Sequence, residues 1–487
     1  MSTNSKVLIS KHQVVTSLVI LGVKKFLQQI LITSANIILA RLLLPEIFGA
    51  FAIIHFLTIS FGLLTDFGLG PALVQKKQEI TTAELRAVFS WIMIASVIFV
   101  GVLFFIAPFL NTLYQGKIGE TGIFWLRIYG LTVLFDHLAI ISISLLQRNL
   151  KFKKLAVGEI ITTAVTLCST IFFAAHGLRL GAFVLGEIIG KVVQGFIFWR
   201  LASWSIGINF SVKNLKKLIP FGRNYQANTL LNAVNSAVVP GFVGAIAGPK
   251  PVAFINWAGG IRQAALAPTE VIEKILFTAG ARAQDDKELL KTLIERLLRV
   301  SCLLAFPLLA IIAAIAPKFI TLIYTQNWLP GLLTLYLSLI EGVLILPKVL
   351  LTDILWALGE SKTVRNITFY WTMLGWVLTV VLVKIWGFNG AVIASMTVSA
   401  TFLYLLKIVR KKINFKFWPQ VLPYLLYSVI TGIITFKLSQ FIRINTLFEL
   451  ILFVIFGLGI YSLIVLLGER RKILKDIYYL RLFITNQ

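Results

Sequence analysis

Apolar segments about as long as a bilayer is thick recur along the whole chain, and this feature constrains the fold most. A spanning helix needs about 20 predominantly apolar residues. The chain of 487 residues has fourteen candidate segments. They are residues 14–40, 47–67, 87–108, 122–146, 155–176, 180–199, 218–240, 252–275, 300–316, 329–357, 366–383, 388–406, 419–436 and 447–468. The pattern predicts an all-α integral membrane protein with about 14 transmembrane helices.

The segments between the predicted helices are too short to hold a soluble catalytic domain on either face of the membrane. The longest, residues 276–299, is expected to be an amphipathic connector on the cytoplasmic side. Charged residues make up 14% of the chain, against about 25% in soluble domains. These features exclude a soluble enzyme and favour a transporter without catalytic residues.

Lysine and arginine are distributed unequally between alternate loops. With the N-terminus placed in the cytoplasm, the inside segments hold 31 of these residues and the outside loops hold 8. Positive charge of short loops is concentrated on the cytoplasmic side. We therefore expect a multi-pass protein of the cytoplasmic (inner) membrane with both termini in the cytoplasm. The same bias explains the net charge of +26 without any nucleic acid partner.

Landmarks of the first half of the chain return in the second half at a nearly constant offset. Three pairs are 204 to 209 residues apart: Pro45 and Pro249, Pro108 and Pro317, and Gly181 and Gly390. Transporters are often built from internal repeats. We therefore predict two six-helix lobes. The predicted parts are a cytoplasmic N-terminus 1–13, an N-lobe 14–210, a C-lobe 211–412, two further helices in 413–468 and a basic cytoplasmic tail 469–487.

The first predicted helix of each lobe carries a polar stripe. Residues three or four apart share one face of a helix. The stripe of segment 14–40 consists of Lys25, Gln29, Thr33 and Asn36, and that of segment 218–240 consists of Tyr225, Asn228, Asn232 and Asn235. These stripes indicate a water-filled cavity between the lobes. The alternative is that the polar groups only bridge neighbouring helices.

Basic residues lie deep in two of the predicted helices. Arg262 is about ten residues into segment 252–275, which corresponds to roughly 15 Å. Lys24 and Lys25 lie at a similar depth in segment 14–40. Charges in the membrane face a cavity or a partner because lipid does not solvate them. Lysine and the two-pronged guanidinium of arginine suit phosphate oxygens, and carboxamides suit sugar hydroxyls.

Acidic residues within the membrane are open to two interpretations. Asp66 and its repeat equivalent Glu270 are candidates for binding a coupling proton or sodium ion, or they cap helix ends. Glu187 and Lys191 are four residues apart, and this spacing predicts that they neutralise each other. The four histidines are scattered and the two cysteines lie in apolar runs. We therefore expect no metal site and no cofactor other than such a coupling ion.

Two short stretches carry a resemblance to a known family. Residues 40–49 read Ala-Arg-Leu-Leu-Leu-Pro-Glu-Ile-Phe-Gly and residues 66–75 read Asp-Phe-Gly-Leu-Gly-Pro-Ala-Leu-Val-Gln. Together with residues 279–286 and the basic segment that follows, they resemble the polysaccharide repeat-unit flippases of the multidrug/oligosaccharidyl-lipid/polysaccharide exporter superfamily. The similarity covers about residues 20–410. It implies two six-helix lobes around a central V-shaped cavity, with two further helices after them.

The resemblance also implies a substrate. Flippases of this lipopolysaccharide and exopolysaccharide type move an undecaprenyl-pyrophosphate-linked oligosaccharide from the inner to the outer leaflet. Arg262 lies where such flippases often carry a cavity arginine, and Lys24 or Lys25 meets their usual basic residue in the first helix. The partners implied are the lipid bilayer, the lipid-linked glycan and the polysaccharide polymerase or export machinery. Three rivals are a multidrug exporter of the same fold, a membrane-embedded polysaccharide polymerase or ligase, and a scaffold protein.

Overall fold

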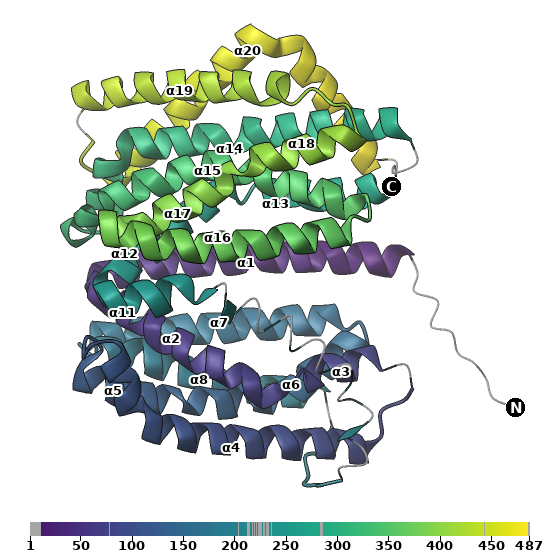
Figure 1. The fold of residues 1–487 in the computed structure, drawn as a ribbon, viewed down its shortest axis with the longest axis vertical. Coiled ribbons are helices and arrows are strands. Elements are labelled where there is room, and N and C mark those ends of the chain that lie inside the picture. The colour runs from purple at the N-terminus through teal and green to yellow at the C-terminus, as the bar shows by residue number, and fades with distance from the viewer. Residues whose placement is uncertain are drawn as a thin grey trace, which may run out of the picture. The chain divides into compact units, whose positions relative to one another are not determined.

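The computed structural model consists of helices, and it has no strand among the residues it describes (Figure 1). The described residues are 11–76, 78–202, 204–211, 215–216, 218, 220, 222, 226, 229, 233–234, 236–282, 286–442 and 444–485. The chain divides into two compact units, residues 1–253 and 254–487. The expectation of an all-α membrane protein is thereby confirmed.

The first unit contains eight long or short α-helices followed by a short irregular helix pair. In chain order these are α1 (Lys11–Leu42), α2 (Pro45–Asp66), α3 (Leu69–Gln75), α4 (Thr82–Leu113), α5 (Gly119–Tyr129), α6 (Leu131–Arg148), α7 (Phe152–Ala175), α8 (Leu180–Ala202), the π-helix η1 (Val238–Val243) and α11 (Gly244–Ala247). Helix α8 packs against α7 and α6, and α1 packs against α7.

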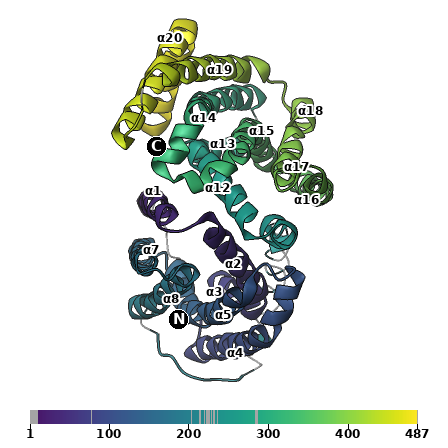
Figure 2. The same ribbon diagram turned by 90° about the vertical axis from the view of Figure 1, so that its left-hand side faces the viewer.

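The second unit is also helical, and α12 (Pro249–Leu266) leads into it from the end of the first. Its further elements are α13 (Thr269–Arg282), α14 (Lys287–Ile323), the 3-10 helix η2 (Gln326–Gly331), α15 (Leu332–Ala357), α16 (Ser361–Trp386), α17 (Asn389–Ala400), α18 (Phe402–Lys412), α19 (Trp418–Phe441) and α20 (Leu447–Thr485). Helices α14 and α15 lie at the centre of this unit, and α19 lies along α14 (Figure 2).

Within the described residues, eleven helical stretches are long and apolar enough to cross a membrane. The predicted segment 218–240 falls largely outside the described residues. Segment 14–40 lies in α1, whose 32 residues are long enough to span a membrane, although α1 is not one of these eleven stretches. Segment 252–275 is divided into α12 and α13 at residues 267–268. The count of fourteen and the lobe boundaries therefore stay predictions.

Most of the connector expected at residues 276–299 is helical, and it forms parts of two longer helices. Helix α13 continues to Arg282, and α14 begins at Lys287 and runs for 37 residues. The Asp286 carboxylate accepts hydrogen bonds from the backbone N–H groups of Glu288 and Leu289, at 3.1 and 3.0 Å. A side-chain cap of this kind satisfies amides that have no partner within the helix.

The order of elements repeats along the chain, as the offsets predict. Helices α2 and α12 begin at prolines 204 residues apart, and each is followed after a short break by a second helix, α3 or α13. The long helices α4 and α14 then follow, with Pro108 and Pro317 inside them. The first break has a backbone cause, since Phe67 and Gly68 have φ angles of 50° and 67°. A left-handed pair of this kind ends an α-helix.

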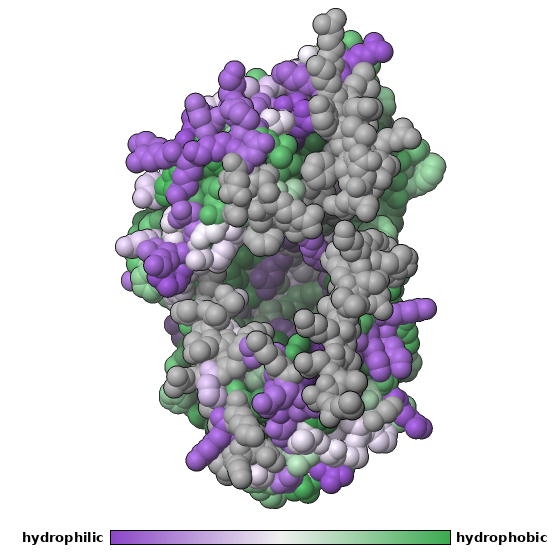
Figure 3. Space-filling view, turned by 90° about the vertical axis from the view of Figure 1, so that its right-hand side faces the viewer, coloured by the Kyte–Doolittle hydropathy of each residue, from purple (hydrophilic) through white to green (hydrophobic). Residues whose placement is uncertain are grey.

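Basic side chains gather at one end of the helices in each unit. In the first unit they include Lys76 after α3, Arg148 at the end of α6 and Lys151 before α7. In the second they include Arg365 near the start of α16 and the run 410–412 at the end of α18. Figure 3 views the right-hand side of Figure 1, where hydrophilic side chains are conspicuous.

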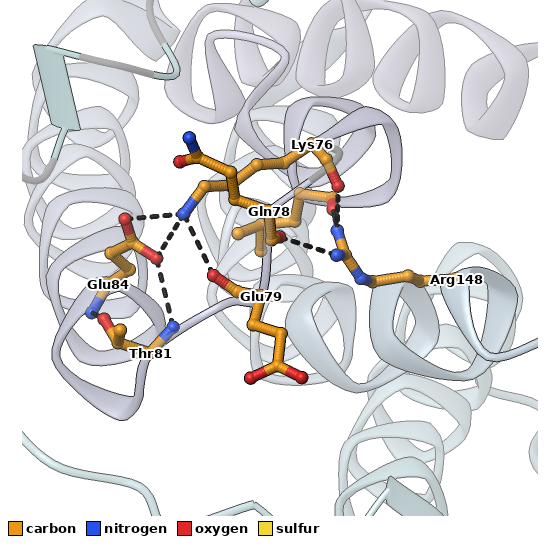
Figure 4. Close-up of polar contacts among 7 residues, drawn as sticks. Lys76, Gln78, Glu79, Thr81, Glu84 and Arg148 are labelled. Carbon is orange, nitrogen blue, oxygen red and sulfur yellow. Dashed lines mark hydrogen bonds and ion pairs between the residues drawn. The ribbon is translucent and has the colours of Figure 1, made fainter. Parts of the chain in front are cut away.

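A polar network ties the loop between α3 and α4 to the end of α6 (Figure 4). The Lys76 ammonium donates to both carboxylate oxygens of Glu84, at 2.7 and 2.6 Å. Glu84 and Thr81 form a capping box at the start of α4. The Arg148 guanidinium donates to the backbone carbonyl oxygens of Lys76 and, at 2.7 Å, Gln78. The loop is thus held at both of its ends by charged side chains.

Small residues allow α7 and α8 to approach closely. A Cβ atom added to Gly186 would lie 2.0 Å from the Thr170 hydroxyl oxygen, and one added to Gly190 would lie 1.8 Å from that of Thr166. Two small residues four apart are typical of closely packed membrane helices. This contact fixes the face that α8 turns toward α7. Lys191 follows directly after the second glycine and, as shown below, meets α6 instead.

Candidate functional site

The polar stripe predicted on α1 exists as an exposed face. Lys25, Gln29, Thr33 and Asn36 are all exposed in the structure. The Gln29 amide donates to the Thr33 hydroxyl at 3.1 Å. A row of polar groups in a spanning helix is costly against lipid. This face therefore suits water or a polar ligand, and it places Lys25 among groups that can bind hydroxyls.

Lys24 does not belong to this stripe. Its ammonium forms an ion pair with the Glu159 carboxylate of α7. One turn later the Gln28 amide donates to the Thr163 hydroxyl of α7 at 2.9 Å. Neighbouring residues of a helix point about 100° apart, so the side of α1 that packs against α7 excludes Lys25. Of the two candidate lysines, Lys25 shares the exposed face.

Arg262 of α12 is held by an acidic partner from another helix. Its guanidinium forms an ion pair with the Glu341 carboxylate of α15, and Glu341 also accepts a hydrogen bond from the Ser395 hydroxyl of α17. The Glu341 side chain is only 2% exposed, whereas that of Arg262 is 19% exposed. The arrangement joins three helices of the second unit around one arginine.

The ion pair does not use every hydrogen-bond donor of the guanidinium. A guanidinium carries five N–H donors in a planar fork. The Nε atom of Arg262 is buried and has no hydrogen-bond partner among the described residues. Glu341 compensates the charge in the absence of a ligand and orients the guanidinium. The sequence gives no sign of this pair, because nothing in the spacing of the residues connects Glu341 with Arg262.

The candidate binding residues of segment 218–240 lie outside the described residues. These are Asn228, Asn232 and Asn235, together with Tyr225 of the same stripe. Their proposed contact with sugar hydroxyls stays a prediction.

The two candidate ion-coupling carboxylates lie at the breaks between paired helices. Asp66 ends α2, and its carboxylate accepts a hydrogen bond from the Gly70 amide in α3 at 3.3 Å. Glu270 lies in the first turn of α13 and accepts a hydrogen bond from the Gln263 amide at 3.3 Å. These contacts are typical of residues that stabilise helix ends. An ion-coupling role for either residue stays a prediction.

Lys191 is paired differently from the interpretation based on its spacing. Its ammonium donates to the Asp136 carboxylate of α6 at 2.6 Å. Glu187, one turn earlier on α8, interacts electrostatically with both residues. Lys191 therefore interacts with Glu187, as its spacing predicts, but it forms its ion pair with Asp136 of a second helix.

A further lysine in α15 is stabilised by an aromatic ring. The Lys348 ammonium lies 4.0 Å from the centre of the Trp371 ring of α16. A cation over an indole face is attracted by the ring quadrupole. This contact gives Lys348 a structural partner within the second unit.

Comparisons with known proteins agree on one family and one fold. A family model described as "Polysaccharide biosynthesis protein" matches residues 38–332. An "Uncharacterized membrane protein in cps region" of Klebsiella pneumoniae is 26% identical over 466 residues, which cover 89% of this chain and 91% of that protein. The lipopolysaccharide biosynthesis protein WzxC of Escherichia coli K12 is 25% identical over 324 residues, 63% of this chain and 62% of that protein.

Among solved structures, the lipid II flippase MurJ is similar in fold. The TM-score is 0.76 at 16% sequence identity, and the alignment covers 93% of this chain and 99% of that one. The likeness extends over both units of the chain. Since the family model matches more than half of the residues, this protein belongs to the family of polysaccharide biosynthesis proteins.

Proposed function

We propose that the protein is a flippase for surface polysaccharide biosynthesis. It moves undecaprenyl-pyrophosphate-linked oligosaccharide repeat units across the cytoplasmic membrane by alternating access. The observation that carries this function is the exposed polar stripe with Lys25 on α1, in a chain of the polysaccharide biosynthesis family. A stripe of amides, hydroxyls and one ammonium suits a sugar chain with a phosphate at its end.

Different polar groups bind different parts of the substrate. Lys25 and Arg262 attract the pyrophosphate as cationic groups. Gln29 and Asn36 exchange hydrogen bonds with sugar hydroxyls, while the prenyl tail remains in lipid. Glu341 keeps Arg262 oriented before the substrate arrives and lowers the cost of its charge within the membrane. Transport requires no bond to be made or broken.

A transport assay tests this function directly. The full chain is reconstituted in vesicles with a fluorescent undecaprenyl-pyrophosphate oligosaccharide in both leaflets. A quencher added outside reports how fast inner-leaflet lipid becomes accessible. We expect transfer only in vesicles that contain the protein. Equal transfer in protein-free vesicles, or with an unrelated membrane protein, would contradict the proposal.

The main rival is a multidrug exporter of the same fold. A site for organic cations is expected to be acidic or apolar, and Lys25 on the exposed stripe of α1 disfavours it. A polymerase or ligase would need catalytic groups on a long external loop, and the sequence predicts no such loop. Expression of the protein in a drug-sensitive host distinguishes a flippase from a multidrug exporter, since a flippase leaves resistance to cationic dyes unchanged.

Orientation in the cytoplasmic membrane is a separate prediction. The excess of Lys and Arg places the loops after Lys154, Lys217 and Lys416 inside the cell and the loop after Lys117 outside. Fusions of a fluorescent and a periplasmic reporter at these four positions should therefore be active on those sides. Reversal at two or more of the positions would contradict both the orientation and the fourteen-helix topology.

A further inference from the structure

Three ionisable side chains meet within the first unit, away from the polar stripe of α1. Asp136 lies on α6, and Glu187 and Lys191 lie one turn apart on α8. The Lys191 ammonium donates to the Asp136 carboxylate at 2.6 Å. Glu187 interacts electrostatically with both, but it forms no hydrogen bond or ion pair within the described part of the chain.

The cluster is deep in the membrane. Lys191 follows the first residue of α8 by 11 positions, which corresponds to about 16 Å of helix. That distance is about half of the roughly 30 Å hydrocarbon core. The Asp136 and Lys191 side chains are 45% and 30% exposed. Because lipid does not solvate such charges, these surfaces suit water within the protein interior.

The charges of the cluster do not cancel. Two carboxylates face one ammonium, so the cluster carries one excess negative charge when all three groups are ionised. The charges of Asp136 and Lys191 compensate each other, which leaves the charge of Glu187 uncompensated. A charge in these surroundings is removed most simply by a change of its protonation state.

Titratable groups from the neighbouring helices surround this cluster. From α2, the His55 ring interacts with Lys191 and lies 2.8 Å from the Tyr129 hydroxyl of α5. Tyr129 in turn interacts with Glu187 and Asp136.

The remaining neighbours are engaged elsewhere. From α6, the His137 ring interacts with Asp136 and Lys191 and lies 2.6 Å from the Ser96 hydroxyl of α4. Asp66 of α2 interacts electrostatically with Asp136, and its carboxylate accepts the hydrogen bond from the Gly70 amide at the helix break. From α7, Glu159 pairs with Lys24.

We propose that Glu187, with the Asp136–Lys191 ion pair, forms a proton-binding site that couples substrate movement to the proton gradient. A proton from water adds to a Glu187 carboxylate oxygen, and the net charge of the cluster changes from −1 to zero. The coupling rests on the proposed flippase function, whereas proton binding does not.

Protonation changes the contact between two helices. An ionised Glu187 competes with Asp136 for Lys191, and a neutral Glu187 does not. Proton binding therefore strengthens the contact between α6 and α8. A ligand that favours one arrangement of packed helices shifts the population toward it. The proton thus acts on the packing of the first unit from a position outside the polar stripe.

The proton site is tested by infrared difference spectroscopy on the purified full-length protein during pH titration. Protonation of Glu187 adds a C=O band of a poorly solvated carboxylic acid. We expect Glu187→Gln to lose this band and Glu120→Gln to keep it. Glu120 is the matched control because its carboxyl is exposed at the start of α5. An unchanged band in Glu187→Gln would overturn the proton site.

Coupling is tested separately by glycan export in a flippase-deleted host. Export by the wild type should fall when a protonophore collapses the gradient. Glu187→Gln should export several-fold less at normal abundance and respond little to the protonophore. Normal, protonophore-sensitive export by a variant that lacks the band would overturn coupling. If the wild type shows the band but does not transport, the flippase function fails while the proton site stands.

Discussion

Replacement of Arg262 by glutamine is expected to abolish glycan export in a flippase-deleted host, and replacement by lysine to leave part of it. Glutamine removes the charge and the fork that would hold the pyrophosphate, whereas lysine keeps the charge alone. Hydrogen bonds to charged groups contribute about 1.5–3 kcal/mol each, which corresponds to a loss of at least tenfold. Surface glycan is measured in cells with matched protein abundance.

Arg365→Gln is the matched control for this experiment. Arg365 is exposed near the start of α16, in the same unit. The same change of residue type there should leave export within the scatter of the assay. If Arg262→Gln exports as the wild type does at normal abundance, Arg262 only bridges helices and does not capture the substrate.

The helices of this chain could largely be predicted from its sequence because bilayer thickness imposes one length on every spanning segment. The predicted segment 155–176 corresponds to α7 at Phe152–Ala175, and segment 366–383 lies within α16. The prediction was least accurate where helices are polar or broken. Residues 267–268, an alanine and a proline, interrupt segment 252–275 without changing its hydropathy.

The exposed stripe of α1 was also predictable, since its period follows from the helix itself. The partners of the buried charges were not. Spacing on one helix connects Lys191 with Glu187, but the ion pair is with Asp136, 55 residues away. Lys24 likewise finds its carboxylate 135 residues later in the chain. Contacts between helices depend on how the helices rotate and pack, and the spacing of residues along one helix does not show this.

The ion pair between Arg262 and Glu341 offers an experiment in which stability and function separate. Glu341→Leu should lower the free energy of unfolding by about 3–5 kcal/mol, because it leaves the arginine without its partner. The double variant with Arg262→Leu should recover most of this loss, since replacing both partners removes the unpaired charge. The free energy of unfolding of the purified variants is measured in denaturing detergent. Glu288→Leu, at the exposed Lys291–Glu288 pair, is the control and should change this free energy by less than about 1 kcal/mol.

Glycan export by these variants then shows whether the Arg262–Glu341 pair serves substrate binding or helix packing. A double variant that is stable but exports nothing shows that the arginine acts on the substrate, because its structural contribution has been replaced. A double variant that is stable and exports normally assigns the pair to helix packing alone, and capture of the pyrophosphate would then rest on Lys25. Glu341→Leu with wild-type stability would contradict the buried ion pair itself. Only the first of these results places a cationic group beside the substrate, because there the removal of the charge affects transport after its effect on folding has been cancelled.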